Sequence, residues 1–196
     1  MTKNMSRQRR GNSRQQRRTT AWRWAAFLAV PLILATLVAV STLTETDDVG
    51  IDGAIPFELT AANGQTVSLD NTLAEGDALL YFSMGVGCDG CFAQIPELEA
   101  AMIERELTLL PIMVDPAPMV AAEAARFGIE QPILIDPGAR ISSAYGMVGI
   151  YGHGDRPSHS FALVRQSGDI AWVRHYAEMF VPVGSLLAEL DAALGS

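Results

Sequence analysis

The sequence has little cysteine and, over its first 44 residues, no acidic side chain. Two cysteines in 196 residues exclude a small disulfide-dense domain, which needs several bridges in place of a core. The 17 glycines and 10 prolines are too few for a collagen, and 49% hydrophobic residues exclude a disordered low-complexity chain. The composition therefore predicts a chain that folds around a hydrophobic core.

Basic and acidic residues lie in different parts of the chain. Residues 1–44 hold eight of the 14 basic residues and no acid, whereas residues 45–196 hold the other six, all arginine, and all 22 acidic residues. The second part is long enough for one domain with its own core. Its negative charge argues against a nucleic-acid partner, because phosphates require a basic surface. Function is therefore expected in the second part.

A run of uncharged residues separates the two parts. Residues 24–44 carry no charge and, as a helix, would be about 31 Å long, which matches the hydrocarbon core of a membrane. Basic residues precede this run, and Glu45, Asp47 and Asp48 follow it, which orients the N-terminus toward the cytoplasm. The alternative is a signal peptide cleaved near Ala39-Val40-Ser41, but the run is longer than a usual signal core.

These observations predict a single-pass protein of the cell membrane. Residues 1–23 form a basic cytoplasmic tail, 24–44 a transmembrane helix that acts as a signal anchor, and 45–52 an acidic linker. Residues 53–196 form the working domain, which lies outside the cytoplasm under either reading of the apolar run.

Hydrophobic spacing in the domain predicts strands that alternate with helices. Apolar residues alternate on both sides of Asn63-Gly64, which is a strong hairpin signal; they are Phe57, Leu59, Val67 and Leu69. The remaining segments are predicted as strands at 78–84, 107–114 and 132–135, helices at 88–105, 119–127, 138–145 and 183–194, and a hairpin at 161–176 that turns at Ser167-Gly168. This order indicates an α/β sandwich with a parallel central portion and an antiparallel edge.

The two cysteines, Cys88 and Cys91, are spaced C-x-x-C where a buried strand meets a helix. A structural staple is a weak explanation because so short a loop gives little stabilisation, and zinc requires more ligands. A reversible dithiol/disulfide couple remains. The helix N-terminus favours a thiolate at Cys88, the predicted nucleophile, and Cys91 is the predicted resolving thiol. Asp89 opposes that thiolate, and the sequence leaves the balance between these two effects open.

Several stretches together resemble a known family. IPFELTAANGQTVSL, LLYF, CDGC with FAQIPEL, IDPGARISSAYGM and RPSHSFALVRQSGDI are similar to the alkyl hydroperoxide reductase and thiol-specific antioxidant superfamily, including the membrane-anchored thiol:disulfide oxidoreductases of the cell envelope. The resemblance covers about residues 51–194, and its most specific element is C-x-x-C with Pro96 five positions on. It implies a thioredoxin-like three-layer sandwich with an N-terminal hairpin extension, in which Cys88 and Cys91 are the redox-active disulfide.

The same resemblance implies a substrate-facing segment. Pro157 corresponds to the cis-proline that faces the disulfide in these folds, and the backbone of Arg156 then pairs with an extended substrate. The chain also departs from the family. Gly87 stands where thioredoxin has a tryptophan, Tyr81 and Phe82 stand where it has a buried acid, and Gln94 stands where several envelope reductases have a glutamate that can titrate.

We therefore predict a membrane-anchored, extracytoplasmic thiol:disulfide oxidoreductase. Its partners are cysteine-containing envelope proteins and an upstream thiol or disulfide donor, and it requires no organic cofactor or metal. Whether it oxidises or reduces its clients stays open. The first alternative is a peroxiredoxin-type peroxidase, for which Arg156 would supply the activating cation, although Gly85 stands where that family has a hydroxyl residue. The second is a Cu(I) delivery module that uses the cysteines and His153, His159 or His175, of which His159 is best placed.

Overall fold

The computed structural model describes residues 53–195 of the chain. The predicted cytoplasmic tail, transmembrane helix at 24–44 and acidic linker lie outside the described residues. Within residues 53–195, no helix has the length and hydrophobicity needed to cross a membrane.

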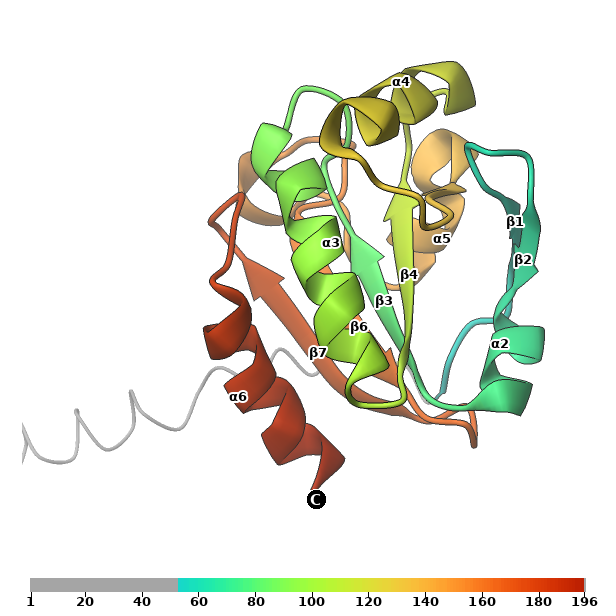
Figure 1. Cartoon of the computed structure of the whole chain (residues 1–196), viewed down its shortest axis with the longest axis vertical. Coiled ribbons are helices and arrows are strands. Elements are labelled where there is room, and N and C mark those ends of the chain that lie inside the picture. The colour runs from blue at the N-terminus through green and yellow to red at the C-terminus, as the bar shows by residue number, and fades with distance from the viewer. Residues whose placement is uncertain (1–52, 196) are drawn as a thin grey trace, which may run out of the picture. The chain divides into compact units, whose positions relative to one another are not determined.

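A five-stranded mixed sheet forms the centre of the domain, in the order β5-β4-β3-β6-β7 (Figure 1). β3 pairs in parallel with β4, and β4 with β5, whereas β6 and β7 are antiparallel to their neighbours. The prediction of a parallel centre with an antiparallel edge is therefore confirmed. The strands are β3 (Ala78–Phe82), β4 (Thr108–Met113), β5 (Leu134–Ile135), β6 (His159–Val164) and β7 (Ile170–Tyr176).

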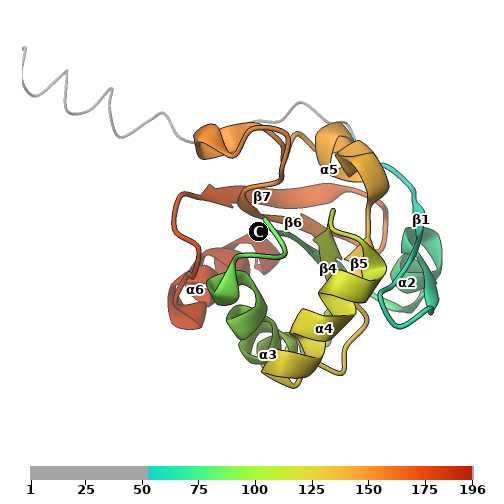
Figure 2. The same cartoon turned by 90° about the horizontal axis from the view of Figure 1, so that it is seen from above.

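Helices cover both faces of this sheet, as the three-layer prediction requires. Seen from above, α3 (Asp89–Ile103), α4 (Ala117–Phe127) and α6 (Val183–Leu194) lie on one side, and α5 (Arg140–Ala144) lies on the other (Figure 2). β3 serves both hydrophobic clusters, because Leu79 and Tyr81 face α3 while Leu80 and Phe82 face the opposite layer. Burial on both faces explains why this strand is a continuous apolar run rather than an alternating one.

The N-terminal extension is the predicted hairpin, followed by a helix that the sequence pattern missed. β1 (Glu58–Thr60) pairs with β2 (Thr66–Ser68), and Leu59 lies opposite Val67. Leu69 was predicted to continue the second strand, but it begins α2 (Leu69–Glu75). The Ser68 hydroxyl caps that helix by accepting a hydrogen bond from the Asn71 N–H at 3.5 Å. Leu69 is buried in either conformation, so its hydrophobicity alone did not distinguish them.

Two further segments complete the fold, and the second of them, β6, places His159 beside the cysteines. Short 3-10 helices, η1 (Pro137–Ala139) and η2 (Ile150–Gly152), flank α5. β6 begins at His159, two residues before the predicted start of the hairpin at Phe161. This earlier start makes His159 part of the sheet, where it pairs with Tyr176 of β7 and its side chain has a fixed direction.

Candidate redox site

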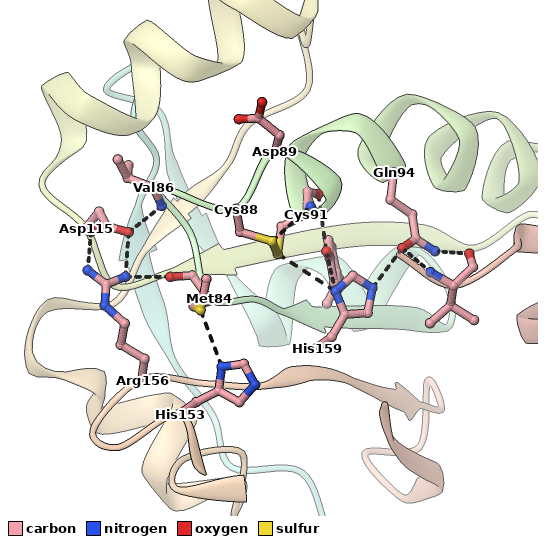
Figure 3. The surroundings of a disulfide bond; sticks show 12 residues. Met84, Val86, Cys88, Asp89, Cys91, Gln94, Asp115, His153, Arg156 and His159 are labelled. Atoms are coloured by element: carbon pink, nitrogen blue, oxygen red, sulfur yellow. Dashed lines mark hydrogen bonds and ion pairs between the residues drawn. A yellow bond between two sulfur atoms is a disulfide. The ribbon is translucent and has the colours of Figure 1, made fainter. Parts of the chain in front are cut away.

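The C-x-x-C motif lies at the start of α3, shortly after the end of β3, as predicted. Cys88 is the N-cap residue of α3, and its sulfur is bonded to that of Cys91, with Cα atoms 5.3 Å apart (Figure 3). Cys88 is 4% exposed and Cys91 is fully buried. Cys88 is therefore the outer sulfur and Cys91 the inner one, which is the arrangement that the predicted roles of nucleophile and resolving thiol require.

The outer sulfur receives a hydrogen bond from the helix N-terminus. The Cys91 N–H donates to Cys88 Sγ at 3.2 Å. A backbone N–H in this position, together with the positive end of the helix dipole, stabilises a thiolate. Asp89 turns away from the sulfurs, and its exposed carboxylate pairs with Arg126 of α4 (Figure 3). The opposition expected from Asp89 is therefore reduced by a neighbouring cation.

The loop before Cys88 is held by an ion pair whose carboxylate, Asp115, is buried. The Val86 N–H donates to Asp115 at 2.8 Å, and Arg156 binds both oxygens of that carboxylate, at 3.0 and 2.6 Å. Burial acts to raise the pKa of Asp115, but the hydrogen bonds from Arg156 and Val86 outweigh it and hold that pKa below its usual value. A Cβ at Gly85 would lie 2.2 Å from the Asp115 oxygen, and Gly85 has a φ of +81°. Only glycine fits this turn.

A second glycine allows the β7–α6 loop to approach the motif closely. A Cβ at Gly90, between the cysteines, would lie 2.7 Å from the Met179 carbonyl oxygen and 3.5 Å from Phe180 Cβ. Backbone atoms cannot move aside as a flexible side chain can, so a larger residue at Gly90 would displace this loop. Phe180 is 40% exposed, which leaves an apolar side chain at the surface beside the motif.

Arg156 and Pro157 are placed differently from what the resemblance implies. All peptide bonds in residues 53–195 are trans, so the predicted cis-proline at Pro157 is wrong. Pro157 is buried and forms an antiparallel bridge with Val148. The Arg156 N–H donates to the His153 carbonyl at 3.3 Å, within its own turn. The segment that leads into β6 is thus paired to its own chain, and its contact with the disulfide comes from His159.

The inner sulfur faces a buried, uncharged cluster. His159 Nδ1 lies 3.9 Å from Cys91 Sγ, and the Tyr81 hydroxyl donates to the Cys91 carbonyl at 3.2 Å. The same hydroxyl lies 3.2 Å from His159 Nδ1. Burial lowers the pKa of His159 to about 4 and raises the pKa of Tyr81 well above its usual value. Both side chains are therefore neutral at physiological pH.

Gln94 connects this cluster to the loop before α6. His159 Nε2 lies 2.8 Å from Gln94 Oε1, and the Gln94 amide exchanges two hydrogen bonds with the backbone of Val181, at 2.7 and 3.1 Å. As expected for an amide in place of a glutamate, Gln94 forms hydrogen bonds but cannot titrate. Here it fixes both the imidazole and the loop from one position on α3 (Figure 3).

Comparison with known proteins agrees with this geometry. The sequence profile of the AhpC/TSA family matches residues 51–173. The chain belongs to this family. The superfamily predicted from the sequence is thus confirmed, and members of the AhpC/TSA family are thiol redox proteins with a thioredoxin fold. No curated protein matches the chain in sequence.

Solved structures share the fold of this AhpC/TSA chain at low sequence identity. Peroxidoxin BcpB from Mycobacterium tuberculosis has a TM-score of 0.60 and 22% identity, over 72% of this chain and 95% of that one. A putative protein disulfide isomerase from Bacteroides thetaiotaomicron has a TM-score of 0.57 and 22% identity, over 74% and 89%. AhpC from Enterococcus faecalis has a TM-score of 0.61 and 18% identity, over 72% and 90%. These similarities show a shared fold, and the general thiol redox function rests on the family match.

The sequence predicts His159 only as a candidate copper ligand and not as a member of the buried cluster beside Cys91. The signal was present, because a strand that begins at His159 places it on the same face as Phe161 and Leu163, toward α3. The other histidines lie elsewhere. His153 Nδ1 contacts Met84 Sδ at 3.3 Å, and His175 Nδ1 contacts Ser160 Oγ at 2.8 Å. No group of three metal-binding side chains occurs between residues 53 and 195.

Proposed function

We propose that this AhpC/TSA-family chain is a thiol:disulfide oxidoreductase that exchanges disulfides with protein clients through Cys88 and Cys91. One observation carries the proposal: the two sulfurs are bonded to each other at a helix N-terminus, with a backbone N–H directed at the outer one. That arrangement stabilises the thiolate that must attack a client and keeps the second sulfur within bonding distance of the first.

The exchange has two steps. In the reducing direction, the Cys88 thiolate attacks a client disulfide, which forms a Cys88–client bond and releases one client thiolate. The Cys91 thiolate then attacks Cys88 Sγ, forms the internal disulfide and leaves the electron pair on the second client sulfur. The client gains two electrons and the enzyme loses two. In the oxidising direction the same steps run backward, so one site serves either purpose.

We further propose that residues 24–44 anchor the chain, with the redox domain outside the cytoplasm. The clients are then cysteine-containing envelope proteins, and an upstream membrane or secreted partner restores the active state. The charge asymmetry around the apolar run supports this orientation. Protease digestion of intact cells should remove the domain and spare the N-terminal tail; digestion of the tail instead would contradict the orientation.

The decisive experiment is the reduction potential of the pair in the purified full chain. The protein is equilibrated in defined thiol/disulfide buffers, and the free thiols are counted after an acid quench. A two-electron couple near −270 mV would identify a reductant of client disulfides, and one near −120 mV an oxidant, on the usual scale of such proteins, which runs from about −270 to about −120 mV. Absence of any reversible two-electron couple would overturn the proposal.

Peroxide reduction is the second candidate, and membership of the AhpC/TSA family favours it. Cys88 would then attack a peroxide oxygen to form a sulfenic acid, and Cys91 would displace water to form the same disulfide. Arg156, the cation considered for this role, is bound to Asp115 and the Met84 carbonyl. The reduced full chain is mixed with hydrogen peroxide or with a client disulfide, and the faster oxidation identifies the activity.

A further inference from the structure

The inner half of the redox site holds a histidine that takes no part in the two sulfur-exchange steps. His159 is buried in the protein, and its Nδ1 lies 3.9 Å from the sulfur of Cys91. We propose that His159 is the proton acceptor for Cys91 when that thiol attacks the mixed disulfide on Cys88. This role rests on the proposed exchange function and adds a catalytic group to it.

Gln94 determines which ring nitrogen of His159 carries the proton. The Val181 carbonyl can only accept, so it must face the Gln94 NH₂ group, and the Val181 N–H must face the Gln94 oxygen. The amide is therefore oriented by the backbone on both sides. Its oxygen can only accept from His159 Nε2, which must carry the N–H. A neutral imidazole has one N–H, so Nδ1 presents a lone pair toward Cys91 Sγ.

The surroundings keep this imidazole neutral while the disulfide is closed. The polar groups that face it are the Tyr81 hydroxyl from β3, Cys91 and Gln94 from α3, and Tyr176, its cross-strand neighbour on β7. None of these groups is charged at neutral pH in the disulfide form. Burial alone lowers the pKa of His159 to about 4. The ring is thus an unprotonated base in the resting protein.

Tyr81 is placed to stabilise the protonated ring once it forms. Its hydroxyl lies 3.2 Å from both the Cys91 carbonyl and His159 Nδ1, so it can donate to either while Nδ1 is unprotonated. Once Nδ1 is protonated, the hydroxyl hydrogen goes to the carbonyl and an oxygen lone pair faces the ring. A newly formed Nδ1–H would have this oxygen and the Cys91 thiolate as acceptors. The thiolate is also an adjacent opposite charge in a buried site, where such attraction is strong.

The proposed step is balanced within the site. In the mixed disulfide, the Cys91 S–H proton passes to His159 Nδ1, and the resulting thiolate attacks Cys88 Sγ. The S–S bond between the cysteines forms, and the bond from Cys88 to the client breaks with its electron pair on the client sulfur. The imidazolium then gives its proton to the departing thiolate or to solvent. His159 returns to its neutral form, and no other reactant is needed.

A coloured leaving group separates the two steps of the exchange. The reduced full chain is mixed in a stopped-flow instrument with dithiobis(nitrobenzoate), which releases one thiolate when Cys88 attacks and a second when Cys91 resolves. We expect His159→Gln to leave the first phase unchanged and to slow the second at least tenfold at neutral pH, since general base catalysis contributes about 10²–10⁴-fold. The second phase of the variant should then accelerate steadily with pH, as expected for an unassisted buried thiol.

A matched variant and the wild type separate the outcomes. His175→Gln changes another buried histidine of the same hairpin, one that contacts Ser160 rather than the sulfurs, and should leave both phases unchanged. Equal second phases and equal pH profiles in the wild type and His159→Gln would overturn the role of His159. Failure of the wild type to release the second thiolate would instead contradict the exchange function itself.

A measurement on the unaltered protein tests the proposal without relying on the folding of a variant. Nitrogen-15 NMR of the oxidised full chain reports the tautomer of each histidine. We expect His159 to be neutral at neutral pH, with its proton on Nε2. A proton on Nδ1 would leave no lone pair toward Cys91 and would overturn the proposal.

Discussion

The two sulfurs of the disulfide are three residues apart in sequence, yet their surroundings differ in kind. The outer side, around Cys88, is built on charges: Asp115 with Arg156 beneath the loop, and Asp89 with Arg126 on the surface. The inner side, around Cys91, is built on neutral hydrogen bonds among Tyr81, Gln94 and His159. Within one helix turn, the surroundings change from charged side chains held in ion pairs to neutral side chains held by hydrogen bonds.

This difference matches what disulfide exchange demands of each sulfur. The outer thiol must be an anion before it meets a client, so a helix N-terminus and a compensated carboxylate suit it. The inner thiol is best kept protonated until the client is attached, because a second thiolate beside Cys88 would destabilise the first by like-charge repulsion. A buried neutral base fits that need, since it takes a proton only when the attack begins. The following predictions test this division of labour.

Replacing either cysteine should produce the largest effects. Cys88→Ser should abolish exchange, because the sulfur that meets the client is lost. Cys91→Ser should still attack clients but should accumulate mixed disulfides, because the resolving sulfur is missing. Non-reducing electrophoresis of the full chain after incubation with disulfide-bonded client proteins distinguishes the two variants. Mixed disulfides with Cys88→Ser and none with Cys91→Ser would reverse the assignment of the two sides.

On the inner side, His159 should make the free energy of unfolding depend on pH. The pKa of His159 is about 4 in the folded protein and 6.5 in an unfolded chain, so between these values the unfolded state binds more protons. Stability should therefore fall as pH drops from about 6.5 to 4, by up to about 3 kcal/mol, and the loss should level off below pH 4. Urea denaturation of the oxidised wild type and of His159→Gln measures this difference.

The region above pH 6.5 serves as the internal control for that experiment. There the two stability curves should run parallel, whatever constant offset the substitution introduces. A variant whose stability falls as steeply as that of the wild type between pH 6.5 and 4 would show that His159 is not the group responsible.

The outer side of the disulfide could be predicted from the sequence more fully than the inner side. The C-x-x-C motif, the helix start at Cys88 and the alternation of strands with helices follow from local periodicity and turn residues. Tyr81, Gln94 and His159 come from three separate elements, so their meeting depends on strand order and register, which local pattern does not determine. Pro157 shows the reverse error, because a family correspondence was transferred to a segment that pairs with its own chain at Val148.

The outer ion pair should change stability by a similar or smaller amount, and at a lower pH than His159 does. We expect Asp115→Asn to reduce the free energy of unfolding by about 1–3 kcal/mol at neutral pH, since Arg156 and the Val86 N–H lose a charged acceptor. The pKa of Asp115 is held below 3.8 in the folded state, so this stabilisation is present above that pH. It should disappear as pH falls through the lower, folded value.

An exposed aspartate provides the comparison for that variant. Asp191 pairs with Arg105, but its side chain is 53% exposed, against 6% for Asp115. Asp191→Asn should therefore cost less than about 1 kcal/mol, as is usual for surface pairs. Equal losses for the two substitutions would mean that the carboxylate beneath the active-site loop contributes no more than an ordinary surface charge.

The smallest effects should come from the charges nearest the outer sulfur, because solvent screens them. Asp89→Asn removes a carboxylate beside Cys88 and should speed alkylation of that thiol by iodoacetamide, whereas Arg126→Gln leaves Asp89 uncompensated and should slow it. Each change should be less than about threefold, since Arg126 and Asp89 are both exposed.

Added salt should reduce both effects. It should leave the rate of resolution by Cys91 unchanged, because no charged side chain contacts that sulfur among residues 53–195. An equal salt dependence of alkylation and resolution would remove the contrast between the two sides.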